Sequence, residues 1–147
     1  MAKYEIVRMP TEQNELQEVL EEYTPFLDAM YTENDRALFG EVNFILDHWL
    51  FLWDTGAGYF LTKRNDSGDL VMVAMLTQFR DLWSARPRLE IHRVAMADIP
   101  ENDVNKEIDD MVEYLISVSS LMRFNLLYYN TREPNGNEHK ELVWIGK

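Results

Sequence analysis

The chain has 147 residues, of which 46% are hydrophobic and 27% are charged, a composition that predicts one folded domain over residues 1–147. Its 14 basic and 26 acidic residues give a formal net charge of −12, which disfavours direct binding to nucleic acids and to anionic membranes. The absence of cysteine excludes disulfides, thiolate nucleophiles and cysteine-ligated metals. No apolar run approaches the roughly 20 residues of a membrane span, and the N-terminus has no secretory signal pattern, so an intracellular or intraparticle location is expected.

The first part of the chain predicts one strand followed by helices. Residues 4–9 alternate loosely between apolar and polar types, as in a strand. Apolar residues of the range 16–23 recur at helical spacing with glutamates between them, which predicts an amphipathic helix with an acidic outer face. Pro25 is interpreted as the first residue of a second, short helix. The apolar stripe of residues 36–54 predicts a further helix that ends at Gly56.

The second part predicts three strands, a long helix and two more strands. The expected strands cover residues 59–64, 70–80, 89–97, 124–129 and 141–145. The long helix is expected over residues 103–122, where apolar residues recur at helical spacing. The strand–helix–strand order at its two ends predicts a parallel pair within an otherwise antiparallel sheet. The fold class is therefore α+β.

Two titratable residues on the expected strand 89–97 are candidates for acid–base chemistry. Glu90 and His92 stand two residues apart, so their side chains share one face of the strand. Beside a bound amine they could act as general base and proton relay. The alternative interpretation is a solvent-facing side of the strand with no catalytic role.

The turn between this strand and the long helix is a candidate phosphate site by position alone. Such a site needs glycines, which let the backbone approach closely, and free N–H groups at the helix start. This turn has no glycine and carries Asp98, Glu101 and Asp103, with Lys106 as compensation. We expect these carboxylates to cap the helix and to repel a pyrophosphate.

A tryptophan-bearing, arginine-rich loop and the C-terminal segment are the candidate contact surfaces. Trp and Arg dominate interface hot spots. The candidate interaction residues are Leu82, Trp83, Arg86, Arg88 and Trp144. The alternative is a loop that buries its Trp, with the arginines as a solvated surface patch.

The element order resembles that of the GNAT superfamily of N-acetyltransferases over about residues 3–130. The resemblance implies a mixed, mostly antiparallel sheet flanked by helices. In that family the fourth strand often carries a catalytic glutamate near its start, here Glu90. The strand ends in a glycine-rich turn that binds the pyrophosphate of acetyl-CoA, and the fifth strand splays away to hold the pantetheine arm. Residues 101–106 match no position of that turn's Arg/Gln-x-x-Gly-x-Gly/Ala motif. Asn130 matches a family position, but the polar stretch 131–137 stands where the family has a helix with a tyrosine acid.

These departures favour a non-catalytic, GNAT-like protein that works through protein contacts and binds no cofactor. In size and in its degenerate turn the chain resembles small GNAT-like virion proteins of tailed phages. This resemblance implies a structural or assembly component of the cytoplasm or of a virus particle. The expected partner is a protein or a viral assembly, and homo-oligomerisation is left open.

Two alternatives stay open beside this hypothesis. The first is an active acetyl-CoA-dependent N-acyltransferase, with Glu90 and His92 as its catalytic pair. In that case the backbone N–H groups of Val104, Asn105 and Lys106 hold the pyrophosphate. The second is an acidic DNA mimic that inhibits a nucleic-acid-binding enzyme, for which the clustered glutamates of residues 15–22 provide the negative charge.

Overall fold

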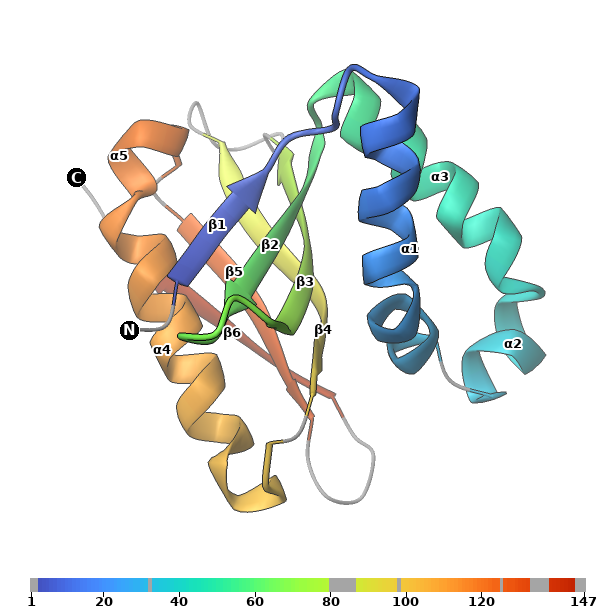
Figure 1. Cartoon of the computed structure of the whole chain (residues 1–147). Coiled ribbons are helices and arrows are strands. Elements are labelled where there is room, and N and C mark those ends of the chain that lie inside the picture. The colour runs from blue at the N-terminus through green and yellow to red at the C-terminus, as the bar shows by residue number, and fades with distance from the viewer. Residues whose placement is uncertain are drawn as a thin grey trace. The chain divides into compact units, whose positions relative to one another are not determined.

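The computed structural model describes residues 3–31, 33–79, 87–97, 99–124, 126–132 and 138–144. Its strands form one six-stranded sheet in the order β1-β2-β3-β4-β5-β6 (Figure 1). With the helices between these strands, the predicted α+β class is confirmed. Contacts within the chain define two units, residues 1–75 with 94–97, and residues 76–93 with 98–147. The single domain over residues 1–147 stays a prediction.

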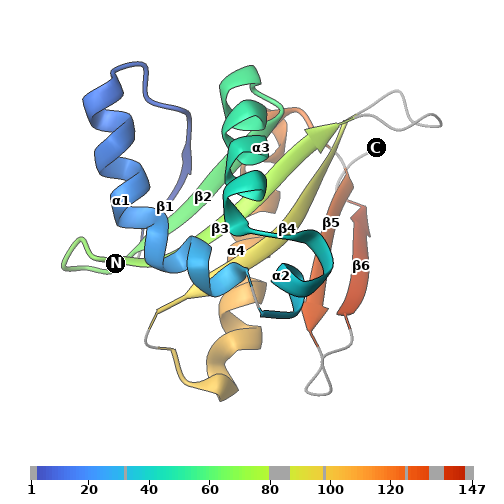
Figure 2. The same cartoon turned by 90° about the vertical axis from the view of Figure 1, so that its right-hand side faces the viewer.

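The first unit combines two paired strands with three helices. Its elements are β1 (Lys3–Val7), α1 (Gln13–Met30), α2 (Glu33–Phe39), α3 (Val42–Thr55), β2 (Gly58–Arg64) and the first part of β3 (Leu70–Phe79). β1 and β2 are antiparallel, with Lys3 opposite Arg64 and Val7 opposite Phe60. α1 and α3 lie on the same side of β2 (Figure 2).

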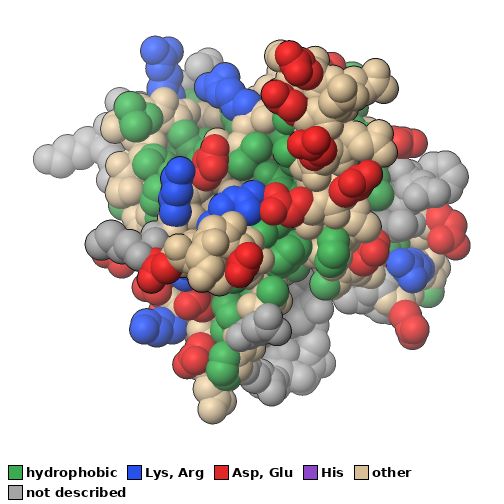
Figure 3. All heavy atoms as spheres, in the orientation of Figure 1, with side chains coloured by type: hydrophobic (Ala, Val, Ile, Leu, Met, Phe, Trp, Pro, Cys, Tyr) green, Lys and Arg blue, Asp and Glu red, His purple; other side chains and the backbone are tan. Residues whose placement is uncertain are grey.

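An aromatic cluster forms the core of this unit. Phe60 of β2 is 2% exposed, and its ring lies 4.9 Å from that of Trp53 and 5.4 Å from that of Tyr23, both in edge-on geometry. Such aromatic pairs stabilise the fold by more than the burial of their apolar surface alone. On the outer side of α1 the glutamates of residues 15–22 are exposed, and acidic side chains gather over this helix (Figure 3). The amphipathic helix with an acidic face is thus confirmed.

α1 continues unbroken through Pro25, so the expected start of a separate helix at this residue is wrong. Proline removes one backbone N–H from the helical ladder. The helix persists because Tyr23 and Leu27, on either side of the proline, are both buried. The Thr24 hydroxyl also donates a hydrogen bond of 2.7 Å to the carbonyl oxygen of Leu20.

The expected single helix over residues 36–54 is instead split at Gly40. This residue has a φ of +92°, a left-handed conformation that glycine adopts without steric cost and that a continuous helix excludes. The Tyr31 hydroxyl donates to the Gly40 carbonyl oxygen at 2.6 Å. The predicted end of α3 at Gly56 is confirmed, since this residue also has a positive φ, of +79°.

The second unit contains the remaining strands and helices. Its elements are the last residues of β3, most of β4 (Arg88–Met96), the short helix η1 (Glu101–Asp103), α4 (Val104–Ser117), α5 (Ser119–Met122), β5 (Leu126–Arg132) and β6 (Glu138–Trp144). β5 and β6 are antiparallel, from Leu126 opposite Trp144 to Arg132 opposite Glu138. None of the helices described in either unit is long and apolar enough to cross a membrane.

The long helix predicted over residues 103–122 is interrupted at Val118. The Val118 amide donates to the carbonyl oxygens of both Tyr114 and Leu115, a shared bond typical of a tightening helix end. The Ser117 hydroxyl donates to the Tyr114 carbonyl oxygen, so a serine competes with the backbone at this turn. The buried residues Met111 and Leu115 still lie on the predicted apolar face of α4.

Candidate functional site

β4 has one buried face and one half-buried polar face. Leu89 and Ile91 are almost fully buried, whereas Glu90 and His92 are half-buried. This alternation follows from the two-residue period of a strand. It places the two candidate acid–base residues on the same face, as the sequence indicated.

The His92 side chain is held by a residue of the neighbouring strand β3. The distance between Thr77 Oγ1 and His92 Nε2 is 2.6 Å, a short hydrogen bond in a partly buried position. Sequence reasoning missed Thr77. The sequence does contain a signal for Thr77, because Thr77 and Gln78 are the polar residues of the otherwise apolar strand Leu70–Phe79. A hydroxyl in such a strand needs a hydrogen-bond partner.

The next polar residue along β3 also makes a long-range contact. The Gln78 side-chain amide donates to the carbonyl oxygen of Met122 at 2.6 Å, which ties the end of β3 to the end of α5. Thr77 and Gln78 point to opposite faces of their strand. The first therefore contributes to the polar face beside His92, and the second supports the helical layer.

β4 and β5 are parallel neighbours that part after four residue pairs. Their pairing runs from Arg88 opposite Leu126 to Ile91 opposite Tyr129. Among the described residues no pair of these two strands follows, although β4 continues to Met96 and β5 continues to Arg132 beside β6. Glu90 therefore lies within the last paired stretch, and His92 directly follows it.

The start of α4 is reached through η1 without a side-chain cap. The Asp103 carboxylate makes no capping hydrogen bond, so the expectation that the carboxylates of this turn cap the helix is wrong for Asp103. Its backbone is αR rather than extended, and extended backbone is what a capping side chain requires. Asn105 and Lys106 are exposed, and Val104 is half-buried. The first-turn N–H groups are thus not occupied by an Asp103 side chain.

The candidate contact residues divide into two groups. Leu82, Trp83 and Arg86 lie outside the described residues. Arg88 opens β4 opposite Leu126, and Trp144 of β6 pairs with the same Leu126 from the other side. The sheet register therefore places Arg88, Leu126 and Trp144 in one row across β4, β5 and β6. Arg88 and Trp144 are 56 positions apart in the sequence (144 − 88).

The described part of the chain offers no metal centre, since no three His, Asp or Glu side chains in it are close enough to hold an ion. The polar face of β4, beside the point where β4 and β5 diverge, carries the two candidate acid–base residues Glu90 and His92. The residues of this polar face come from β3 and β4. The start of α4, which follows β4 in the chain, is the candidate site for the phosphates of a cofactor.

Comparisons by sequence found no similar protein, whereas comparisons by structure did. No protein-family model matches this sequence, and no curated protein matches it. A GNAT family acetyltransferase from Staphylococcus aureus aligns over 99% of this chain and 98% of its own, with a TM-score of 0.61 at 9% identity. This chain has the GNAT fold.

Other solved GNAT enzymes agree with this assignment. The ribosomal-protein-alanine N-acetyltransferase from Brucella melitensis aligns over 91% of this chain and 82% of its own, with a TM-score of 0.56 at 16% identity. An aminoglycoside acetyltransferase from an uncultured soil sample, solved with sisomicin, aligns over 90% and 78%, with a TM-score of 0.58 at 11% identity. Identities this low show the GNAT fold alone, which confirms the predicted fold.

Proposed function

We propose that this chain binds an acyl-coenzyme A and transfers the acyl group to an amine. The observation that carries the proposal is the parting of β4 from β5 directly beside the half-buried pair Glu90 and His92. In the GNAT family the gap between these two strands holds the pantetheine arm. A base on the adjacent strand face would then lie next to the reacting acyl group.

The roles of the residues follow from their positions. A bound acyl-CoA supplies a thioester-activated acyl group. Glu90 would accept the proton that the attacking amine loses, and His92, two residues further on the same face, would pass a proton toward solvent. Thr77 holds the His92 ring and so fixes its orientation. The thiolate leaves as the amide bond forms, and the relay can return a proton to it.

The start of α4 would receive the diphosphate of the cofactor. η1 runs directly into α4, so its carbonyl groups lie one turn before the N–H groups of Val104, Asn105 and Lys106, and the Asp103 side chain does not cap this start. Lys106 adds an exposed positive charge. Asp103 and Glu107 add negative charge at the same turn, so we expect weaker binding than at a glycine-rich turn. The preceding helical turn and the carboxylates both reduce the affinity of this helix start for a diphosphate.

Thermal unfolding with and without millimolar acetyl-CoA tests the proposal. Saturation at about 100 times the dissociation constant adds about 2.7 kcal/mol to the free energy of unfolding, which raises Tm by several degrees. ATP at the same concentration is the control for diphosphate binding alone. The absence of a shift with acetyl-CoA at millimolar concentration would overturn the proposal.

A transfer assay then separates binding from catalysis. With a panel of primary amines, Glu90→Gln should retain the acetyl-CoA-induced Tm shift and lose most of its turnover, because a carboxamide cannot accept the proton. Glu113→Gln, at an exposed position of α4, is the matched control and should behave as the parent. Equal turnover in both variants would exclude Glu90 as the base.

The second candidate is a non-catalytic protein that works through protein contacts. The row formed by Arg88 and Trp144 on either side of Leu126 favours it, because it joins two residue types common in hot spots. Cross-linking in a lysate of the source organism, with Arg88→Ala as comparison, tests this candidate. The virion role and the DNA-mimic role stay predictions from the sequence, and neither the described residues nor the comparisons point to them.

A further inference from the structure

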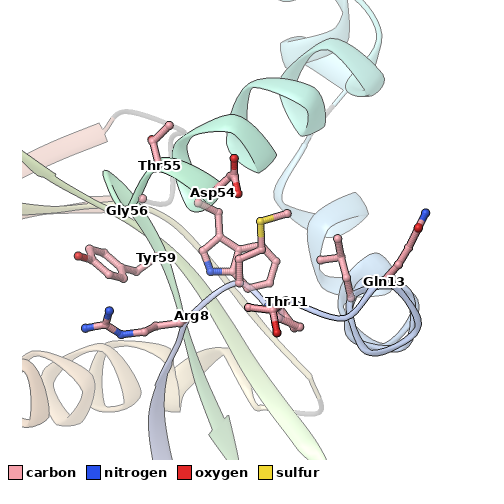
Figure 4. Close-up of a pocket in the computed structure, with 12 residues that line it drawn as sticks. Arg8, Thr11, Gln13, Asp54, Thr55, Gly56 and Tyr59 are labelled. Carbon is pink, nitrogen blue, oxygen red and sulfur yellow. The ribbon is translucent and has the colours of Figure 1, made fainter.

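The first unit carries a pocket that has no part in the proposed acyl transfer. It has a volume of about 720 Å³ and lies between the β1–α1 connection and the end of α3 (Figure 4). Ligand sites in proteins commonly have volumes of about 300–1,000 Å³. The described residues of its apolar lining are Met9, Pro10, Leu16 and Trp53.

The walls of this pocket are held together by hydrogen bonds within the unit. The Trp53 indole N–H donates to the Val7 carbonyl oxygen at 2.9 Å, which joins α3 to the end of β1. At the end of α3 the Gly56 amide donates to the Trp53 carbonyl oxygen at 3.2 Å. Because Trp53 is only 3% exposed, its position is fixed by the core. The core therefore holds the Trp53 wall of the pocket in place.

Opposite charges stand at two sides of the pocket. Figure 4 shows the Arg8 side chain beside Tyr59, and the Asp54 side chain apart from both of them, near Thr55. Both charged residues are exposed. Within the part of the chain that the structure describes, neither side chain has a hydrogen bond or an ion pair. The lining thus contains a cation and an anion that do not pair with each other, together with the apolar side chains.

We propose that this pocket binds a small zwitterion, a molecule with a carboxylate at one end of an apolar body and an ammonium group at the other. The Arg8 guanidinium would bind the carboxylate in the bidentate geometry that this group favours. The Asp54 carboxylate would bind the ammonium group, and the apolar body would lie against the half-buried residues Met9 and Pro10. A ligand with one charge leaves one of the two protein charges without a partner.

A matched series of three compounds, titrated into the full chain, tests whether the pocket requires both charges on the ligand. 4-(Aminomethyl)benzoate carries both charges, whereas 4-methylbenzoate carries only the carboxylate and 4-methylbenzylamine only the ammonium group. Each is titrated into the protein while the amide signals of Met9 and Gly56 and the indole N–H signal of Trp53 are followed by NMR. We expect the zwitterion to bind about 1.4- to fivefold more tightly than either single-charge compound, the range for one exposed ion pair.

Two variants assign the two ends of the ligand. Arg8→Gln should remove the advantage of the zwitterion over 4-methylbenzylamine, and Asp54→Asn its advantage over 4-methylbenzoate. Lys3→Gln and Asp28→Asn, at exposed positions of the same unit, are the charge-matched controls and should leave all three affinities unchanged. Equal affinity for the three compounds, or shifts confined to signals outside the pocket, would overturn the proposal. This result is independent of the acetyl-CoA experiment.

Discussion

Thr77 and His92 are joined across neighbouring strands by a hydrogen bond of 2.6 Å between Oγ1 and Nε2. A hydroxyl can donate to a ring nitrogen or accept from it, so this contact is compatible with either tautomer of the imidazole. In both tautomers the hydrogen bond restricts the orientation of the His92 ring. Thr77 is therefore a positioning residue for the proposed relay.

Thr77→Val keeps the shape of the side chain and removes the hydroxyl. We expect the free energy of unfolding to fall by about 0.5–1.5 kcal/mol, because the half-buried ring nitrogen loses its partner. The ¹⁵N chemical shifts of the His92 ring should move at the same time, because Nε2 loses its hydrogen bond to the Thr77 hydroxyl. Thr77→Ser retains a hydroxyl and should restore both properties. Ring shifts identical in the parent and the valine variant would contradict this role.

Asp103→Asn removes a negative charge at the start of α4 without changing the size of the side chain. If the first-turn N–H groups bind the diphosphate of acyl-CoA, this variant should bind acetyl-CoA about two- to fivefold more tightly, because a nearby exposed charge is worth about 0.5–1 kcal/mol. The gain should shrink at high salt, where screening is stronger. Isothermal titration calorimetry at two salt concentrations measures it.

The control for this variant is Asp109→Asn, which removes an exposed charge from the second turn of the same helix. The dipole effect falls off within the first turn, so the control should change the acetyl-CoA affinity less. A larger gain from the control than from Asp103→Asn would place the bound phosphate elsewhere.

Phe60→Leu tests the aromatic core of the first unit. Phe60 is 2% exposed and lies edge-on to Trp53 and Tyr23, so we expect a loss of about 1–3 kcal/mol in the free energy of unfolding. Phe51→Leu is the matched control, since that side chain is 63% exposed and its loss should change stability by less than about 0.5 kcal/mol. Urea unfolding measures both, and equal effects would be inconsistent with the described packing.

The ion pair between Glu22 of α1 and Arg64 of β2 predicts a pH dependence of stability. Arg64 donates to both Glu22 carboxylate oxygens, at 2.6 Å and 2.9 Å. These hydrogen bonds lower the pKa of Glu22 below its ordinary value, against the opposing effect of partial burial. A lowered folded-state pKa gives stability that is present above the unfolded-state pKa and is lost as the pH falls through the folded-state pKa.

Glu22→Gln should therefore reduce stability at neutral pH and have little effect once the carboxylate of the parent is protonated. The two side chains are 32% and 42% exposed, so solvent screening limits the loss to about 1 kcal/mol or less. Glu15→Gln, at an exposed position of the same helix, is the control and should show a smaller difference. Unfolding curves at pH 7 and pH 3 measure it, and a difference that does not vary with pH would contradict the assignment.

The spacing of apolar residues along the chain predicted most of the helices and strands. It gave wrong helix boundaries where burial or backbone conformation outweighs this spacing. The period of the apolar residues predicted α1 and β3, and the glycine after α3 predicted its end. The pattern predicts a helix start at Pro25, but burial of the residues on either side keeps this proline inside α1. The pattern predicts Gly40 in the interior of a helix, but its left-handed backbone ends α2. Neither outcome can be computed from the spacing of neighbours alone.

The sequence by itself determined the order of the strands and the face that Glu90 shares with His92. Both depend on periods of two or 3.6 residues, which are properties of the local backbone. The tertiary structure decided that β4 and β5 part after Ile91, that Thr77 binds His92, and that Arg8 and Asp54 face one pocket. Each of these joins residues that are distant in the chain, and only the packing of the sheet and helices brings them within reach.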